Sequence, residues 1–229
     1  MFRFKQFAID DSRCGMKLGT DSVALGAWVG LPSATDPAGR RHALDLGAGC
    51  GILALMAAQR SGTLIIDAVE LDPAACDDCR ANFAASPWHD RLRAHCCSFG
   101  DFEPVVKPDL IISNPPYFVT GLRAPQTSRA AARHELAMTV EAIVSYAARW
   151  LASQGSLALI LPAERADQCI FQGELAGLKL RRQCDLSHSP GRQPIRTMLQ
   201  LSRLDGPIER TTLAVRSDAF AALTAAFYL

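Results

Sequence analysis

The stretch Ala43–Arg60, which reads ALDLGAGCGILALMAAQR, decides the fold class of this chain. Its first four residues form a short, mainly apolar run typical of a buried strand, and Ile52–Arg60 carries apolar residues at helical spacing. Between them lie Gly47, Gly49 and Gly51, and glycine permits positive φ and a close approach of backbone to a ligand. A strand, a glycine turn and a helix in this order predict one α/β unit.

The same alternation continues along the chain. Strands are predicted at 43–46, 64–70, 92–97, 109–113, 156–161, 178–185 and 197–203, and helices at 52–60, 72–86, 139–153, 164–176 and 218–229. This alternation indicates a mostly parallel sheet with helices on both faces. Because no helix separates the last two strands, they are expected as an antiparallel pair at one edge. The prediction is a doubly wound α/β fold with a seven-stranded sheet.

Composition excludes several classes of protein. Hydrophobic residues make up 49% and charged residues 21% of the 229 residues, so a largely disordered chain is excluded. The net charge is only +1, so a nucleic acid would have to be bound by a local basic patch. No apolar run reaches 18 residues and no signal peptide is recognised, so we expect a cytoplasmic protein with no membrane partner and with its eight cysteines reduced.

An acidic residue follows the second predicted strand. Glu70 lies nineteen residues after Gly51, where an acid can accept hydrogen bonds from both hydroxyls of a ribose. Gly49-x-Gly51-x-x-Ala54 fits the dinucleotide fingerprint. The form Asp45-x-Gly-x-Gly-x-Gly is instead that of S-adenosylmethionine-dependent methyltransferases, in which an acid at the start of the loop binds the ammonium group of the cofactor. The glycine turn alone leaves both cofactors open.

A second motif, Asn114-Pro115-Pro116-Tyr117, separates these alternatives. Two prolines stiffen the backbone and remove two amide donors, which leaves the Asn114 side-chain oxygen and the Pro115 carbonyl as acceptors. These acceptors suit an NH2 group on an sp2 carbon, because holding both hydrogens pulls the nitrogen toward tetrahedral geometry and frees its lone pair. The motif therefore predicts methyl transfer to an adenine amine or a glutamine amide, with Tyr117 stacked on a base.

With both motifs, the chain resembles class I S-adenosylmethionine-dependent methyltransferases of the N-P-P-Y group. More narrowly, it resembles the bacterial family that methylates the N6 amine of adenine 37 in valine tRNA. The similarity extends over nearly the whole chain. Besides the two motifs, the segments that carry it are Met16–Trp28, Ala68–Leu71, Ser86–Trp88 and Phe227–Leu229. It implies S-adenosylmethionine as the cofactor and a tRNA anticodon loop as the partner, with no stable protein partner.

The resemblance also implies the site residues. Those expected at the cofactor are Asp45, Gly47, Gly49, Gly51, Glu70, Ser98, Phe99 and Asn114, and those expected in catalysis are Asn114, Pro115, Pro116 and Tyr117. Those expected at the substrate are Lys17, Thr20, Asp21, Arg123, Arg129, Arg133 and Arg196. Residues 1–40 would close over the cofactor side of a main domain at 41–229. Ser98-Phe99 stands where such enzymes often carry Asp-Ile, so either Ser98 or Asp101 is expected at the cofactor adenine.

Alternative interpretations of the basic residues, the cysteines and the function remain open at this point. Lys179–Arg210 holds seven Lys and Arg against three acids, which indicates either a solvated edge or contact with RNA phosphates. No metal is expected, because Cys76 and Cys79 fall within a helix and the adjacent Cys96 and Cys97 point apart. The competing functions are a release-factor-type glutamine N5-methyltransferase, a ribosomal RNA amino methyltransferase, a nicotinamide oxidoreductase and a catalytically silent RNA-binding module.

Overall fold

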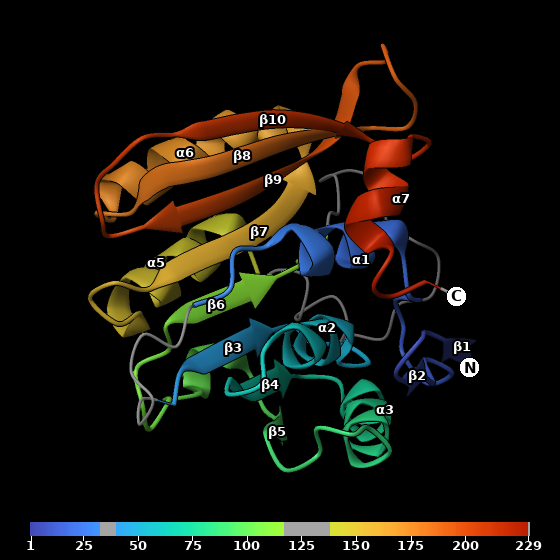
Figure 1. Ribbon diagram of the computed structural model, residues 1–229. Helices are drawn as coiled ribbons and strands as arrows, with labels where there is room; N and C mark the ends of the chain where they lie inside the picture. The colour runs from blue at the N-terminus through green and yellow to red at the C-terminus, as the bar shows by residue number, and fades with distance from the viewer. Residues whose placement is uncertain (33–39, 117–137, 229) are drawn as a thin grey trace, which may run out of the picture.

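The protein is described here by a computed structural model that covers residues 1–32, 40–116 and 138–228. Its centre is an eight-stranded sheet (Figure 1). The strand order is β10 (Glu209–Ala214), β8 (Lys179–Ser187), β9 (Pro194–Ser202), β7 (Ser156–Pro162), β6 (Leu110–Ser113), β3 (His42–Leu46), β4 (Ile65–Glu70) and β5 (Leu92–Cys96). Strand β9 alone among these runs antiparallel to its neighbours. Strands β1 (Phe2–Arg3) and β2 (Ala8–Ile9) form a separate antiparallel pair.

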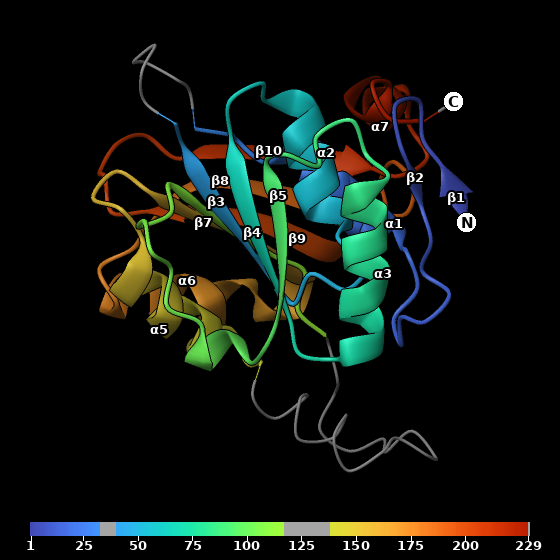
Figure 2. The same ribbon diagram turned by 90° about the horizontal axis from the view of Figure 1, so that it is seen from below.

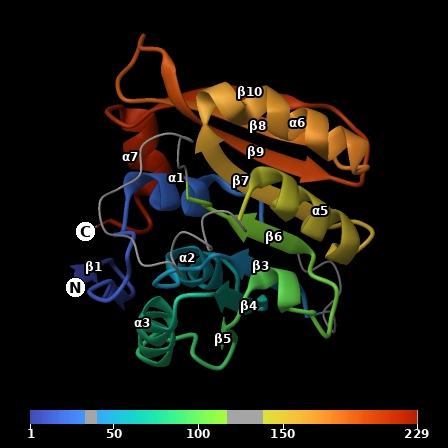
Figure 3. The same ribbon diagram turned by 180° about the vertical axis from the view of Figure 1, so that it is seen from behind.

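Helices cover both faces of the sheet (Figure 2). One face carries α1 (Thr20–Trp28), α2 (Ile52–Arg60), α3 (Pro73–Ala84) and α7 (Asp218–Thr224), and the other carries α5 (Val140–Trp150) and α6 (Ala166–Leu175). Figure 3 shows α5 and α6 from their own side. The short 3-10 helices η1 (Phe99–Asp101) and η2 (Ala163–Arg165) come before and after α5 in sequence. Each face of the sheet therefore packs into its own apolar core.

Local sequence explains where the helices begin. The Asp72 side chain accepts a hydrogen bond from Ala74 N at 3.1 Å, and Pro73 occupies the first position of α3. Thr139 caps α5 in the same way by accepting from Ala142 N at 3.1 Å. The predicted helices at 52–60, 72–86 and 139–153 are thus confirmed, apart from residues at their ends.

The fold class is confirmed, but the predicted strand count of seven is wrong. The additional strand β10 lies outside β8 and pairs with it in parallel, so the antiparallel pair β8–β9 does not form the edge. The residues of β10 are mostly polar and exposed, so they show no apolar alternation. Helix α1 was also missed, because nearly all of its residues are buried and it has no polar face to produce a helical period.

The fold brings the two sequence motifs together. Strands β3, β4 and β6 are parallel neighbours, so the turns that follow them lie at the same edge of the sheet. The N–H groups of Gly47 and Ala48 donate to Val69 O of β4 at 2.9 and 3.1 Å, and Ser113 Oγ donates to Leu46 O at 2.7 Å. The first two bonds tie the glycine turn to β4, and the third ties the end of β3 to the end of β6. None of the helices that the structure describes is long and apolar enough to cross a membrane.

Candidate active site

The glycine turn between β3 and α2 requires its glycines for two different reasons. Gly51 has φ +86°, and a Cβ added to it would lie 2.5 Å from Phe83 Cε1, so α3 packs directly against the turn. Gly49 has φ +55°, and a Cβ added there would meet no atom within 4 Å. The left-handed backbone at both positions favours glycine, and the space beside Gly49 leaves the turn open to a ligand.

Asp45, the last residue but one of β3, lies fully buried behind this turn. Its Oδ2 accepts a hydrogen bond from Ala54 N of α2 at 3.2 Å, whereas its Oδ1 is buried without a hydrogen-bond partner in the described part of the chain. Burial, supported by the nearby charge of Glu70 and opposed by the Ala54 N–H, raises the pKa of Asp45 to about 7. An orphaned buried carboxylate oxygen of this kind suits a cationic group of a ligand.

Glu70, at the end of β4, holds the glycine turn in place. Its Oε2 accepts from Gly49 N and its Oε1 accepts from Asp72 N, both at 2.8 Å. Each ionised carboxylate oxygen has room for a second donor, so these bonds are compatible with the predicted contact to ribose hydroxyls. Asn82 of α3 supports the turn from behind, because its Nδ2 donates to Cys50 O at 2.9 Å.

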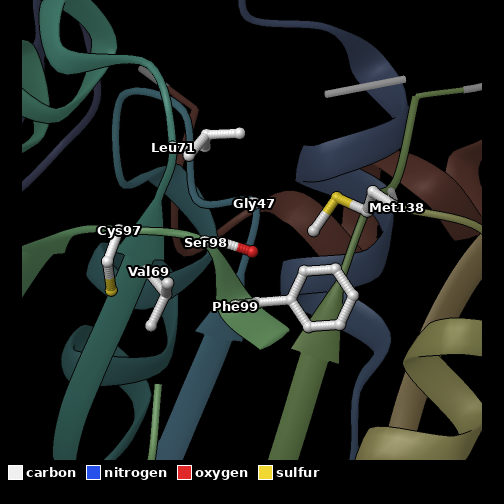
Figure 4. A pocket seen from close by; sticks show the side chains of 7 residues that line it. All are labelled: Gly47, Val69, Leu71, Cys97, Ser98, Phe99 and Met138. Atoms are coloured by element: carbon white, nitrogen blue, oxygen red, sulfur yellow. The ribbon is translucent and has the colours of Figure 1, made fainter. Parts of the chain in front are cut away.

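A small cavity opens beside the glycine turn (Figure 4). It is lined by Gly47, Val69, Leu71, Cys97, Ser98, Phe99 and Met138. In Figure 4 the Met138 side chain lies directly above the Phe99 ring, and the Ser98 hydroxyl points toward the space beside them. Ser98 also caps η1 by accepting from Gly100 N at 3.3 Å. Asp101 is exposed and does not line this cavity, so the geometry favours Ser98 over Asp101 for the predicted contact.

The Asn-Pro-Pro turn follows β6 at the same edge of the sheet. Asn114 is half-buried, and its Nδ2 donates to Ser22 Oγ of α1 at 2.9 Å. Pro115 is buried and Pro116 is half-buried. Tyr117 lies outside the described residues, as do Arg123, Arg129 and Arg133. Sequence reasoning missed Ser22 and Met138, since no motif marked either of them.

The predicted substrate residues near the N-terminus surround the start of α1. Asp21 Oδ2 forms an ion pair with Arg196 Nε of β9 at 2.7 Å. Lys17 Nζ donates to the carbonyls of Asp11 and Ser12 at 2.6 and 3.0 Å, and Thr20 is exposed at the first turn of α1. Asp21 and Arg196 thus join α1 to the sheet.

The basic stretch Lys179–Arg210 makes mostly internal contacts. Three of its cations form ion pairs: Lys179 with Asp205, Arg182 with Glu209 and Arg196 with Asp21. Three others donate hydrogen bonds: Arg181 and Arg203 to backbone carbonyls, and Arg210 to the Gln183 side chain. Arg192, in the turn between β8 and β9, is exposed and has no side-chain partner among the residues described. Arg216, which follows β10, is also exposed, and its backbone N donates to His188 O, just past the end of β8, at 3.2 Å.

The cysteines are free thiols in the structure. Burial raises the pKa of the Cys76 thiol to about 11, and it raises the pKa of Cys79 as well. Residues 1–32, 40–116 and 138–228 contain no group of three or more His, Cys, Asp or Glu side chains that could hold a metal ion. The Cys76-x-x-Cys79 spacing thus corresponds to packed thiols on α3.

The comparisons with known proteins agree with this geometry. The family model described as the methyltransferase small domain matches residues 30–176. The chain belongs to the methyltransferase small domain family. Over its full length it is 42% identical to a protein of Tolumonas auensis and 36% identical to one of Escherichia coli O157:H7, and it covers 96% and 94% of them. Both relatives are named tRNA1(Val) (adenine(37)-N6)-methyltransferase, so the resemblance predicted from the sequence is confirmed.

Solved structures support the same fold for this methyltransferase small domain protein. A predicted O-methyltransferase from Agrobacterium tumefaciens superposes with a TM-score of 0.63 at 16% identity, covering 90% of this chain and 96% of the other. Precorrin-6y C5,15-methyltransferase from Geobacter metallireducens gives 0.55 at 14% identity, covering 86% and 94%. At these identities the likeness concerns the fold alone.

Family and fold together make the chain an S-adenosylmethionine-dependent methyltransferase. The residues at the glycine turn fit this cofactor, because the Asp45 oxygen that has no partner among the described residues suits its ammonium group, and Ser98 and Phe99 line a small cavity beside Gly47. The dinucleotide alternative is not needed to explain the turn.

Cofactor affinity is expected to depend on the titration of Asp45. Because the ionised carboxylate attracts the ammonium group, the Kd should rise about tenfold for each pH unit below about 7. Stability of the cofactor-free protein should show the opposite trend. Since folding raises this pKa from 3.8, the contribution of Asp45 to stability is full below about pH 4 and is lost as the pH rises through about 7.

Calorimetry and thermal melts from pH 5.5 to 8 measure both effects, with Asp45→Asn as the control that removes the titrating group. If wild type and Asp45→Asn show the same pH dependence of cofactor affinity, the titrating group is another one.

Proposed function

We propose that this protein transfers the methyl group of S-adenosylmethionine to the exocyclic N6 amine of adenine 37 in the anticodon loop of valine tRNA. The observation that carries the proposal is the Asn114 turn at the end of β6, tied by Ser113 to the end of β3, where the glycine turn of the cofactor site begins. The full-length relatives named for this reaction support the choice of substrate.

In the proposed reaction the chain holds and polarises the amine. When bound, S-adenosylmethionine supplies a methyl group on a positively charged sulfonium. Asn114 Oδ1 and the Pro115 carbonyl accept the two hydrogens of the amine, which keeps the lone pair on nitrogen and orients it. Tyr117 stacks on the extruded adenine, a base whose removal from a loop costs less than removal from a duplex. Asp45, Glu70, Ser98 and Phe99 hold the cofactor, while the glycines of the turn shape its site.

For the RNA we propose contacts on both sides of the catalytic turn. Residues 1–40 cap the cofactor side, with Lys17 and Thr20 at the RNA and with Asp21 and Arg196 acting through their ion pair. Arg123, Arg129 and Arg133, which follow the turn in sequence, bind phosphates of the anticodon arm.

Arg192 and Arg216 extend this proposed RNA surface. Both are exposed and have no side-chain partner in the described ranges, and both lie at the carboxyl end of β8, on the edge of the sheet that carries Asn114 (Figure 1). Arg192→Glu and Arg216→Glu should each weaken tRNA binding roughly fivefold at about 0.1 M salt, because each loses a phosphate contact and adds a repulsive charge.

The matched control is Lys107→Glu, which reverses an exposed charge in the connection between β5 and β6, at the opposite end of the sheet. Electrophoretic mobility shifts over a salt series measure the effect. Equal affinities for all three variants would place the RNA elsewhere.

Transfer of tritiated methyl groups tests the proposed substrate. Unmodified valine tRNA should be labelled, and the same tRNA with guanosine in place of adenosine 37 should not. Release factor and ribosomal RNA serve as competing acceptors in parallel reactions. If the release factor or ribosomal RNA is labelled and tRNA is not, the proposed substrate is wrong and the labelled acceptor takes its place.

A further inference from the structure

Ser22 of helix α1 contacts the catalytic turn from a distant part of the chain. Its Oγ accepts the hydrogen bond from Asn114 Nδ2 at 2.9 Å, and the residue is buried. We propose that Ser22 is a positioning residue that fixes the orientation of the Asn114 side-chain amide during methyl transfer. The inference rests on the proposed catalytic role of Asn114 and adds a residue that neither motif contains.

The chemistry of an amide explains why its orientation matters. The amide carries two donors on nitrogen and its acceptor on oxygen, on opposite sides of Cγ. With Nδ2 held by Ser22, the amide keeps the orientation in which Oδ1, rather than an N–H group, is available to accept from the substrate amine. After a half turn the same side chain would direct N–H groups at the N–H groups of the substrate and repel them. The bond to Ser22 also polarises the amide and makes its oxygen a better acceptor.

Helix α1 is fixed firmly enough to act in this way. The ion pair of Asp21 with Arg196 anchors its first turn to β9. A Cβ added to Gly26 would lie 2.6 Å from Met56 Sδ, so α1 and α2 are in close contact, and Arg60 Nη1 donates to Gly26 O at 2.7 Å. Because its backbone is held from two directions, α1 presents the Ser22 hydroxyl at one place.

Three variants separate positioning from structural support. Ser22→Ala removes the acceptor, and Ser22→Thr keeps a hydroxyl. Ser202→Ala is the matched control, because Ser202 is also buried and its Oγ donates to Gly155 O at 3.1 Å, at the opposite end of the sheet. For each protein we would measure the single-turnover rate of methyl transfer to tRNA, the Kd for S-adenosylmethionine by calorimetry and the melting temperature.

Ser22→Ala is expected to lower the single-turnover rate at least about tenfold. Its Kd for the cofactor should stay within about twofold of wild type, and its melting temperature should fall no more than that of Ser202→Ala. Ser22→Thr should recover most of the rate, and Ser202→Ala should keep it. An unchanged rate in Ser22→Ala overturns the inference, and so does a loss of cofactor binding or folding that accompanies the lower rate.

A second measurement does not depend on the substrate. In nitrogen-15 NMR spectra the side-chain NH2 signals of Asn114, assigned by their absence in Asn114→Asp, should shift in Ser22→Ala and stay near their wild-type positions in Ser202→Ala. Unshifted Asn114 signals in Ser22→Ala would overturn the contact itself. If wild type methylates no tRNA, the proposed function fails, and the NMR comparison still decides whether Ser22 orients the amide.

Discussion

Replacement of Asn114 by alanine is expected to slow methyl transfer a hundred- to a thousandfold, a far larger effect than on cofactor affinity, to which Asn114 is expected to contribute only one contact. In the proposed mechanism the side chain supplies one of the two acceptors for the amine, and losing one preorganised polar contact at a reacting group costs rates of this order. Asn114 is half-buried at the end of β6, where its replacement removes the hydrogen bond to Ser22 and leaves the bond from Ser113 to Leu46 intact.

Single-turnover measurements with unmodified valine tRNA, together with calorimetry for S-adenosylmethionine, check this prediction. Asn82→Ala is an instructive comparison, because Asn82 supports the glycine turn through Cys50 O and should change cofactor affinity more than the transfer rate. If Asn114→Ala transfers the methyl group at the wild-type rate, the N-P-P-Y turn does not take part in catalysis as proposed.

Replacement of Asp45 by asparagine is expected to weaken cofactor binding at least about a hundredfold. The variant keeps the size of the side chain but removes the negative charge that is proposed to bind the ammonium group, and removing one member of a buried charge pair costs several kcal/mol. Among the described residues the buried carboxylate accepts one hydrogen bond and its other oxygen has no partner, so the free protein gains little from its charge. The melting temperature of the free variant at pH 8 should therefore not fall.

The combination of lost affinity and kept stability distinguishes a binding role from a structural one. Calorimetry with S-adenosylmethionine and thermal melts of the free protein give both quantities on the same samples. Wild-type cofactor affinity in Asp45→Asn would show that the ammonium group is bound elsewhere, and a large loss of melting temperature would show that Asp45 supports the fold.

Local patterns predicted the centre of the fold and the two motifs of the site. The run from Ala43 to Arg60 contains its strand, turn and helix within eighteen residues, so neighbouring residues alone define it. Strand β10 could not be predicted in this way, because its polar residues pair at an edge and bury little. The contact of Ser22 with Asn114 spans 92 positions and depends on how α1 packs, which no local pattern encodes.

The sequence also could not predict which basic residues are free to contact RNA, because this depends on partners that are distant in sequence. Lysines and arginines in 179–210 looked equivalent in sequence, yet Arg182 pairs with Glu209 and covers the Trp28 ring at 4.5 Å, while Arg192 has no such partner in the part of the chain described. The cations that remain available for RNA are those without a partner in the folded protein, and the sequence does not show which these are. Arg216 lies outside the basic stretch in sequence and comes near the end of β8 only because β10 pairs with β8.

The most direct test of the central claim is mass spectrometry of nucleosides and ribonuclease fragments from unmodified valine tRNA incubated with the protein and S-adenosylmethionine. The account predicts N6-methyladenosine in the fragment that contains position 37, and its absence with Asn114→Ala. No methylated adenosine in wild-type reactions, despite cofactor binding by calorimetry, would contradict it, as would a methyl group on another nucleotide.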